Sequence, residues 1–202
     1  MKLLLTSAGL SRNKIKELLL EKLPKKPEDC SVLVFALIEN KHEEGYKEYI
    51  LNNLRKTGFK DITFYNLKDE KFKKQKGKKY DLLFASGGGT YFMLNKIRKN
   101  GFDKTIKKIV KDGALYFGVS AGSILAGPEI DIAGWGSESD DIDKTLKSTK
   151  GLGFTKIAVY PHFRKSLQKE VDEFRKKVKY PVIELTDGQA VFVDDKGYKI
   201  IE

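Results

Sequence analysis

Residues 118–122, with the sequence GVSAG, place a serine between small residues in the pattern G-x-S-x-G. An apolar run at 114–117 precedes them and a stretch of small residues at 121–126 follows, which predicts a strand, a sharp turn and a helix. So tight a turn pushes its central side chain outward, exposing the Ser120 hydroxyl, and aims the Ala121 N–H at the same point, where an oxyanion would form. The pentapeptide alone is equally compatible with a tight turn in which the serine has no chemical role.

A serine hydroxyl becomes a nucleophile when a base takes its proton, and histidine is the usual base. The chain has two histidines. His162 follows Pro161 at the end of a predicted strand, which favours a general base there. His42 lies among charged residues at a predicted helix start, and this setting is typical of a solvated side chain.

The base in turn needs an acceptor that orients its second ring nitrogen. Asp187, in the turn after a predicted strand at 182–185, is our first choice, although Asp-Gly is also a common turn sequence. The alternatives are the acidic residues of the loop that follows the serine: Asp131, Glu138, Asp140 and Asp141.

Three successive glycines, residues 87–89, follow another predicted strand and precede a helix that begins at Thr90. Because glycine lets backbone N–H groups approach a ligand closely, Gly88 and Gly89 are candidates for the other side of an oxyanion hole. A phosphate cradle at the helix start is the rival interpretation, but the Lys-Ser/Thr pair of a P-loop is missing.

Strands and helices alternate along the chain, which predicts a three-layer α/β fold with a mostly parallel sheet in a single domain, 1–202. Ligands of such sheets bind at the carboxyl ends of the strands, so we expect Ser120, the glycines, His162 and Asp187 at the same edge of one sheet. The predicted strands are 1–7, 31–38, 61–67, 80–86, 114–117, 156–160 and 182–185, with a closing hairpin at 190–193 and 198–201. The predicted helices are 12–22, capped by Ser11, and 43–56, 90–99, 103–111, 121–126 and 165–178.

Composition narrows the class of protein. No stretch of 18 apolar residues is present, so no membrane span is expected, and the single cysteine, Cys30, excludes an internal disulfide and fits a cytoplasmic setting. The net charge of +11 comes from 34 lysines against 5 arginines, and base readout favours arginine, so we expect no nucleic-acid partner. The lysine-rich loop 68–79 has no function that we can derive, and no metal-ligand set is visible.

Taken together, GGGT at 87–90, GVSAG at 118–122 followed by GPEI at 127–130, and YPHF at 160–163 resemble the family of aspartyl dipeptidase (dipeptidase E), peptidase family S51, which includes cyanophycinases. The resemblance covers nearly the whole chain. It implies a fold like that of class I glutamine amidotransferases, Ser120 as nucleophile, His162 as base, and oxyanion donors at Gly88 or Gly89 and at Ala121. In such families the triad acid stands either after the last core strand or in the loop after the serine, so both alternatives remain.

The resemblance also implies a serine peptidase that acts on a small peptide, with no cofactor, as a monomer or a homodimer. Cleavage of Asp-X dipeptides requires a cation for the side chain, for which Arg164 is the candidate. It also requires acids for the amine, for which Asp131, Glu138 and Asp140 are candidates. The sequence GWG at 134–136 departs from the dipeptidase loop, so another substrate side chain is an equal expectation. The alternative function is a non-catalytic protein of the same fold that binds a small molecule or nucleotide.

Overall fold

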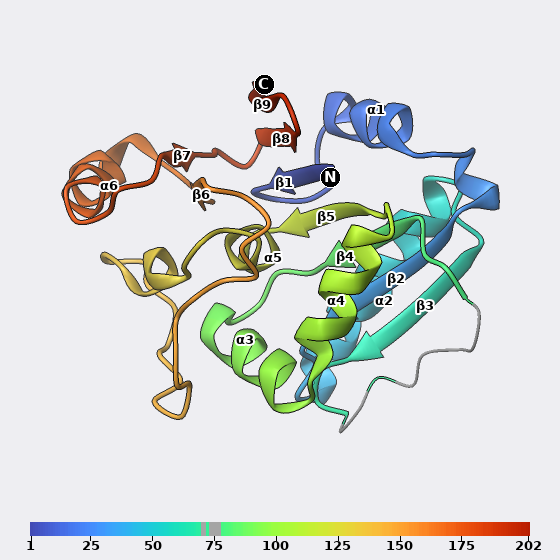
Figure 1. Cartoon of the computed structure of the whole chain (residues 1–202), viewed down its shortest axis with the longest axis horizontal. Helices are drawn as coiled ribbons and strands as arrows, with labels where there is room; N and C mark the ends of the chain where they lie inside the picture. Colours follow the sequence, from blue (N-terminus) through green and yellow to red (C-terminus); the bar gives the residue numbers. More distant parts are fainter. Residues whose placement is uncertain (70–71, 73–77) are drawn as a thin grey trace.

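The computed structural model describes residues 1–69, 72 and 78–202, and Figure 1 shows the course of the chain. Most of the lysine-rich loop 68–79 therefore lies outside the described residues, as do the side chains of Lys41 and His42.

A seven-stranded sheet forms the centre of the described structure. In spatial order the strands are β3 (Asp61–Asn66), β2 (Ser31–Ala36), β4 (Leu82–Ala85), β5 (Leu115–Val119), β1 (Leu3–Thr6), β8 (Ala190–Asp194) and β9 (Gly197–Ile201). The first five of these are parallel, β8 runs antiparallel to β1, and β9 runs antiparallel to β8, which confirms the mostly parallel sheet and its closing hairpin.

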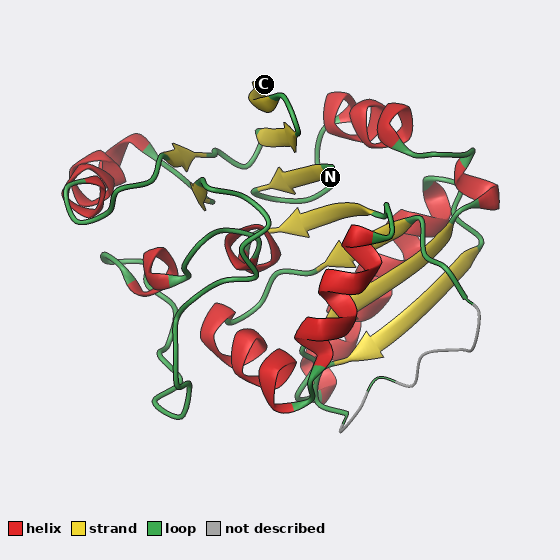
Figure 2. Ribbon diagram, in the orientation of Figure 1, coloured by secondary structure: helices red, strands yellow, loops and turns green. Residues whose placement is uncertain are grey.

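Helices cover both faces of this sheet because strand side chains point alternately to the two sides (Figure 2). Leu4 shares a buried cluster with helices α1 (Asn13–Lys22) and α2 (Lys41–Lys56). Its neighbours Leu3 and Leu5 belong to the opposite cluster, with α3 (Thr90–Lys99), α4 (Phe102–Lys111) and α5 (Ala121–Leu125). The predicted three-layer arrangement is thus confirmed.

The strands β6 (Ala158–Tyr160) and β7 (Val182–Glu184) pair only with each other in the described chain, as a separate two-stranded parallel sheet. The prediction that His162 follows a strand of the same sheet as Ser120 is therefore wrong. β8 pairs along the whole of β1 and occupies the place beside it. The small sheet instead buries Val159 and Ile183 in the core that contains α5, and in Figure 1 it lies to one side with α6 (Gln168–Arg175).

Several element ends differ from the predictions. The helix expected at 165–178 is a short 3₁₀ turn, Lys165–Leu167, followed by α6, which ends at Arg175. Ser11 does not cap α1: Arg12 stands at the cap, and the Ser11 hydroxyl donates instead to the backbone oxygen of Asp187, at 2.9 Å. The long loop after α5 contains a second 3₁₀ turn, Asp131–Gly134, and a third, Pro27–Asp29, lies between α1 and β2.

None of the helices in the described part of the chain combines the length and the apolar character that crossing a membrane requires.

The turn between β5 and α5 brings two glycines against neighbouring backbone. A Cβ atom on Gly122 would lie 2.2 Å from the carbonyl oxygen of Ala85 in β4, and one on Gly118 would lie 2.8 Å from the oxygen of Gly122. Real Cβ atoms essentially never come so close, so only glycine lets the helix start directly over the end of β4.

We predict that Gly122→Ala lowers the free energy of unfolding by about 1–3 kcal/mol, because the methyl group must displace the backbone of β4. The control is Gly45→Ala in α2, where an added Cβ meets nothing within 4 Å and alanine is the better helix former, worth about 1 kcal/mol. Urea titration measures both. Equal midpoints for Gly122→Ala and the wild type would contradict the close approach.

Candidate active site

The edge of the sheet at the carboxyl ends of its parallel strands gathers the polar residues of the site. Gly87 follows β4, Ser120 follows β5 and Ser7 follows β1, and these are three neighbouring strands. Asp187 precedes β8, which reaches the same edge from the other direction because it is antiparallel to β1. His162 arrives from the end of β6 in the small sheet.

Ser120, His162 and Asp187 form a continuous hydrogen-bonded chain. The Ser120 Oγ lies 2.9 Å from His162 Nε2, and His162 Nδ1 lies 2.6 Å from Asp187 Oδ1. An ionised carboxylate only accepts hydrogen bonds, so Nδ1 carries the imidazole proton and Nε2 is left to accept the proton of the serine hydroxyl. None of the loop acids in the described residues hydrogen-bonds His162.

Two of these three hydrogen-bonded residues have backbone conformations that non-glycine residues rarely adopt. Ser120 has φ 49° and ψ −113°, and His162 has φ 57°. Each such conformation costs on the order of 1–3 kcal/mol and persists only where the surroundings impose it. Ser120 therefore lies in the strained turn that the sequence pattern predicts. The backbone of His162 is also strained, which the sequence did not indicate.

The end of β1 fixes the strained serine. The backbone N–H of Ser120 donates to the oxygen of Thr6 at 3.0 Å. The buried Ser123 hydroxyl of α5 bridges the two backbone groups of Thr6, accepting from its N–H at 2.9 Å and donating to its oxygen at 2.8 Å. The first turn of α5 is thereby tied to the carboxyl end of β1.

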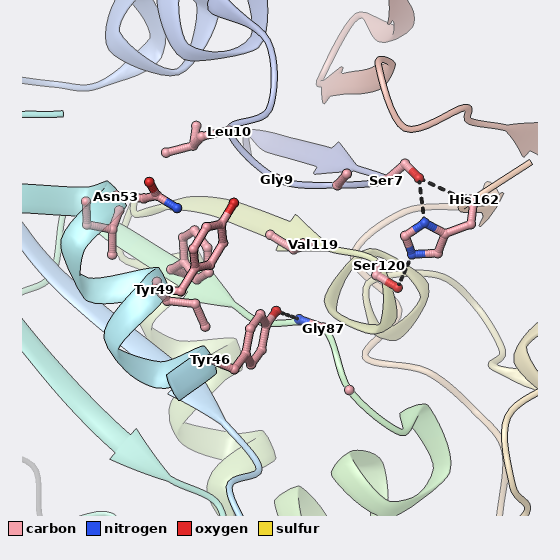
Figure 3. A pocket seen from close by; sticks show the side chains of 15 residues that line it. Ser7, Gly9, Leu10, Tyr46, Tyr49, Asn53, Gly87, Val119, Ser120 and His162 are labelled. Carbon is pink, nitrogen blue, oxygen red and sulfur yellow. Dashed lines mark hydrogen bonds between the residues drawn. The ribbon is translucent and has the colours of Figure 1, made fainter. Parts of the chain in front are cut away.

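Ser7 is a site residue that the sequence reasoning missed. It is fully buried, its Oγ accepts from the backbone N–H of His162 at 2.7 Å, and it donates to Asp187 Oδ1 at 2.9 Å. Figure 3 shows it beside the His162 ring, with Oγ 3.5 Å from Nδ1. Its position as the last residue of the first predicted strand, 1–7, at the edge where ligands bind, was the available signal.

The hydrogen bonds around Asp187 change its acidity. Burial acts to raise the pKa of Asp187, but the hydrogen bonds from Ser7 and His162, with the charges of His162 and Arg164, outweigh it and hold the pKa below its usual value. A carboxyl group whose pKa is lowered by folding stabilises the fold above its unfolded pKa, and this contribution is lost as the pH falls through the lowered folded value. Because this pKa is lowered, Asp187 is ionised at neutral pH and accepts hydrogen bonds from both Ser7 and His162.

Three backbone N–H groups in the turns after β4 and β5 have no hydrogen-bond partner among the described residues: those of Gly88, Gly89 and Ala121. The neighbouring N–H groups are engaged, since Gly87 donates to the Tyr46 hydroxyl at 3.1 Å and Gly122 to the oxygen of Ser86 at 3.0 Å. Gly88 has φ +140°, which only glycine adopts readily, and it lines a cavity next to Ser120.

Two hollows meet at Ser120 and His162. One, of about 300 Å³, lies between α2 and the end of β1 and is mainly apolar. The other, of about 180 Å³, lies at the start of α3, and the residues that line it include Trp135, Glu138 and Asp140.

The predicted substrate-binding residues are only partly brought together. Glu138 lines the smaller hollow and forms an ion pair with Arg164. Asp131 accepts a hydrogen bond from Thr149 at 3.0 Å, and neither it nor Arg164 is among the described residues that line the two hollows. Asp140 does line the smaller hollow, and its Oδ2 accepts from the Thr90 N–H at 2.8 Å.

No group of three or more His, Cys, Asp or Glu residues with the arrangement of a metal site occurs among the residues that the structure describes.

Comparison with known proteins identifies the family. The sequence model of peptidase family S51 matches residues 3–201. Two uncharacterized peptidases, of Listeria monocytogenes and Listeria innocua, are 30% and 29% identical over 127 and 124 residues, which is 59% of this chain in each case. The match spans 59% and 58% of the lengths of these relatives.

Solved structures share the fold. A crystal structure of a candidate peptidase E protein from Listeria monocytogenes EGD-e has a TM-score of 0.77 and 22% identity, covering 100% of this chain and 98% of that one. A peptidase from an acI-B1 Actinobacterium has a TM-score of 0.67 and 16% identity, covering 99% of this chain and 86% of that one.

We predict that Ser7→Ala raises the pKa of Asp187, because the carboxylate loses a hydrogen-bond donor. It also lowers the free energy of unfolding by about 1–3 kcal/mol, because the His162 N–H loses its acceptor. Carbon-detected NMR titration of the Asp187 carboxyl group measures the pKa.

The matched control is Ser11→Ala, since the Ser11 hydroxyl is exposed and donates to the backbone oxygen of the same aspartate. It should leave the Asp187 pKa unchanged. If the two variants shift that pKa equally, Ser7 does not act on the carboxylate.

Proposed function

Because the chain belongs to peptidase family S51, we propose that it is a serine peptidase that hydrolyses a peptide or isopeptide bond in a small peptide through an acyl-enzyme. The observation that carries this proposal is the hydrogen-bonded chain from Asp187 through His162 to a serine in a strained turn. In an ordinary structural turn this strain would only destabilise the fold. In a nucleophile turn it holds the serine hydroxyl in a fixed, outward position. In this proposal residues 1–202 act as one catalytic domain without a cofactor.

The first half of the reaction forms the acyl-enzyme. Ser120 Oγ bonds to the carbonyl carbon while its proton passes to His162 Nε2, 2.9 Å away. The carbonyl oxygen becomes an oxyanion, which the free N–H groups of Gly88 and Ala121 stabilise, with Gly89 as the alternative donor. His162, now positively charged, is stabilised by the carboxylate of Asp187.

The leaving amine takes the proton from His162 Nε2 as the carbon–nitrogen bond breaks, so His162 returns to its neutral form. A water molecule then repeats the sequence: His162 removes its proton, its oxygen bonds to the acyl carbon, and Ser120 leaves with the proton returned by His162. The products are the free acid and the free enzyme.

The smaller hollow supports a role in binding the amino group of the substrate, because Asp140 and Glu138 present carboxylates there. Asp-X dipeptides remain the substrate class that the family suggests. Arg164 is the cation near the site, and a substrate carboxylate would have to displace Glu138 from it. Asp131 accepts a hydrogen bond from Thr149 and is not among the described residues that line either hollow, so it has no part in this binding proposal.

We predict that a fluorophosphonate probe labels the wild-type protein and labels neither Ser120→Ala nor His162→Ala. The first variant has no nucleophile and the second has no base to activate it. Gel fluorescence or intact-mass spectrometry measures labelling, with circular dichroism to verify folding. Labelling of Ser120→Ala would place the reactive nucleophile elsewhere.

Kinetics can distinguish the acid that orients His162, Asp187, from the acid proposed to bind the substrate amine, Asp140. Asp187→Asn should lower kcat on a cleaved peptide by about a thousandfold or more, because the amide favours the wrong imidazole tautomer. Asp140→Asn should act mainly on KM, because it weakens amine binding without touching the base. The opposite pattern would assign the orienting acid to the loop.

A further inference from the structure

The larger hollow at Ser120 is built almost entirely from uncharged side chains. Figure 3 shows Tyr46, Tyr49 and Asn53 leaving α2 toward the side on which Leu10, Val119 and Ser120 lie. Buried Ile50 and Phe84 complete its apolar wall. Its volume of about 300 Å³ is at the small end of the range for ligand sites, roughly 300–1,000 Å³.

The described residues that line this hollow include no Asp, Glu, Lys or Arg. The phenol of Tyr46 stays neutral, because burial raises its pKa and this outweighs the hydrogen bond from the Gly87 N–H. A carboxylate that entered would lose its hydration without gaining a cationic partner, which is strongly unfavourable. An aliphatic or aromatic side chain would instead exchange water for apolar contacts.

The position of the hollow identifies the part of the substrate that reaches it. Gly88, a candidate oxyanion donor, lines it, and Ser120 lies on its border with the smaller hollow that holds Glu138 and Asp140. If the amine of an N-terminal residue binds those acids, the other substituent on the same Cα is directed away from them. The leaving residue of a dipeptide carries a carboxylate, which the apolar hollow does not accommodate.

We propose that this hollow is the subsite for the side chain of the substrate's N-terminal residue and that it selects an uncharged aliphatic or aromatic side chain over an aspartyl one. This inference rests on the proposed peptidase function and specifies its substrate class.

The first test compares two dipeptide series, X-Ala and Ala-X, in which X is Leu, Phe, Asn or Asp. We expect kcat/KM for Leu-Ala and Phe-Ala to exceed that for Asp-Ala by about tenfold or more. Preference for Asp-Ala overturns the proposal, and so does selectivity confined to the Ala-X series.

The second test places a charge in the hollow. Asn53 is half-buried and lines it, whereas its neighbour Asn52 is exposed on α2 and accepts from Arg55 at 3.1 Å. Asn53→Arg should lower the ratio of kcat/KM for Leu-Ala over Asp-Ala by about tenfold or more, since the guanidinium pairs with the aspartyl carboxylate. The matched control, Asn52→Arg, should leave the ratio unchanged.

Asn53→Leu removes the amide without adding a charge, so it tests the two effects of Asn53→Arg separately. It should keep or increase the preference for Leu-Ala. Equal effects of the arginine variants at 52 and 53 on every substrate would overturn the assignment of the hollow.

A binding measurement keeps the subsite and the catalytic proposal distinguishable. Calorimetry with the wild-type protein compares leucinamide with aspartic acid α-amide, and neither ligand needs to be cleaved. Tighter binding of leucinamide supports the subsite even if no dipeptide is hydrolysed, and equal or tighter binding of the aspartyl amide overturns it. Fluorophosphonate labelling reports separately on whether Ser120 is a reactive nucleophile.

Discussion

The site depends on one steric constraint, the contact between the start of α5 and the end of β4. At Gly122 the helix backbone comes so near the carbonyl oxygen of Ala85 that no side chain fits between them. The chain must therefore reverse within a single residue after β5, and Ser120 takes the strained conformation that this reversal demands. The outward hydroxyl and the unpartnered N–H of Ala121 both follow from the same turn.

The end of the first strand also positions the site, because its residues form hydrogen bonds to groups that come from separate sheets. Thr6 holds the start of α5 through Ser123, and Ser7 holds the backbone of His162 and the carboxylate of Asp187. These bonds matter because the side chains of His162 and Asp187 are 49% and 67% exposed and have little packing to position them. A buried hydroxyl with two partners supplies the rigidity that packing does not.

The sequence was informative where local rules decide the structure. The alternation of strands and helices predicted the layers, and small residues at fixed spacing predicted the turn at Ser120. The sequence did not reveal that β6 and β7 leave the main sheet, because β8 occupies the edge of β1 through pairing between residues far apart in the chain. Nor did it show that Glu138 pairs with Arg164, or that Ser11 bonds to Asp187 rather than capping α1, since each of these contacts is settled by tertiary structure.

The separation of the two sheets has an evolutionary consequence. Ser120 is supported by the seven-stranded sheet, whereas His162 and the acids of the smaller hollow stand on the small sheet and the long loop before it. Insertions or substitutions in that second part can remodel what surrounds the base while the strands under the serine keep their pairing. A lineage built on this scaffold can therefore diversify its ligands in one half and inherit the other unchanged, with Thr6 and Ser7 at the end of β1 as the connection that both halves must preserve.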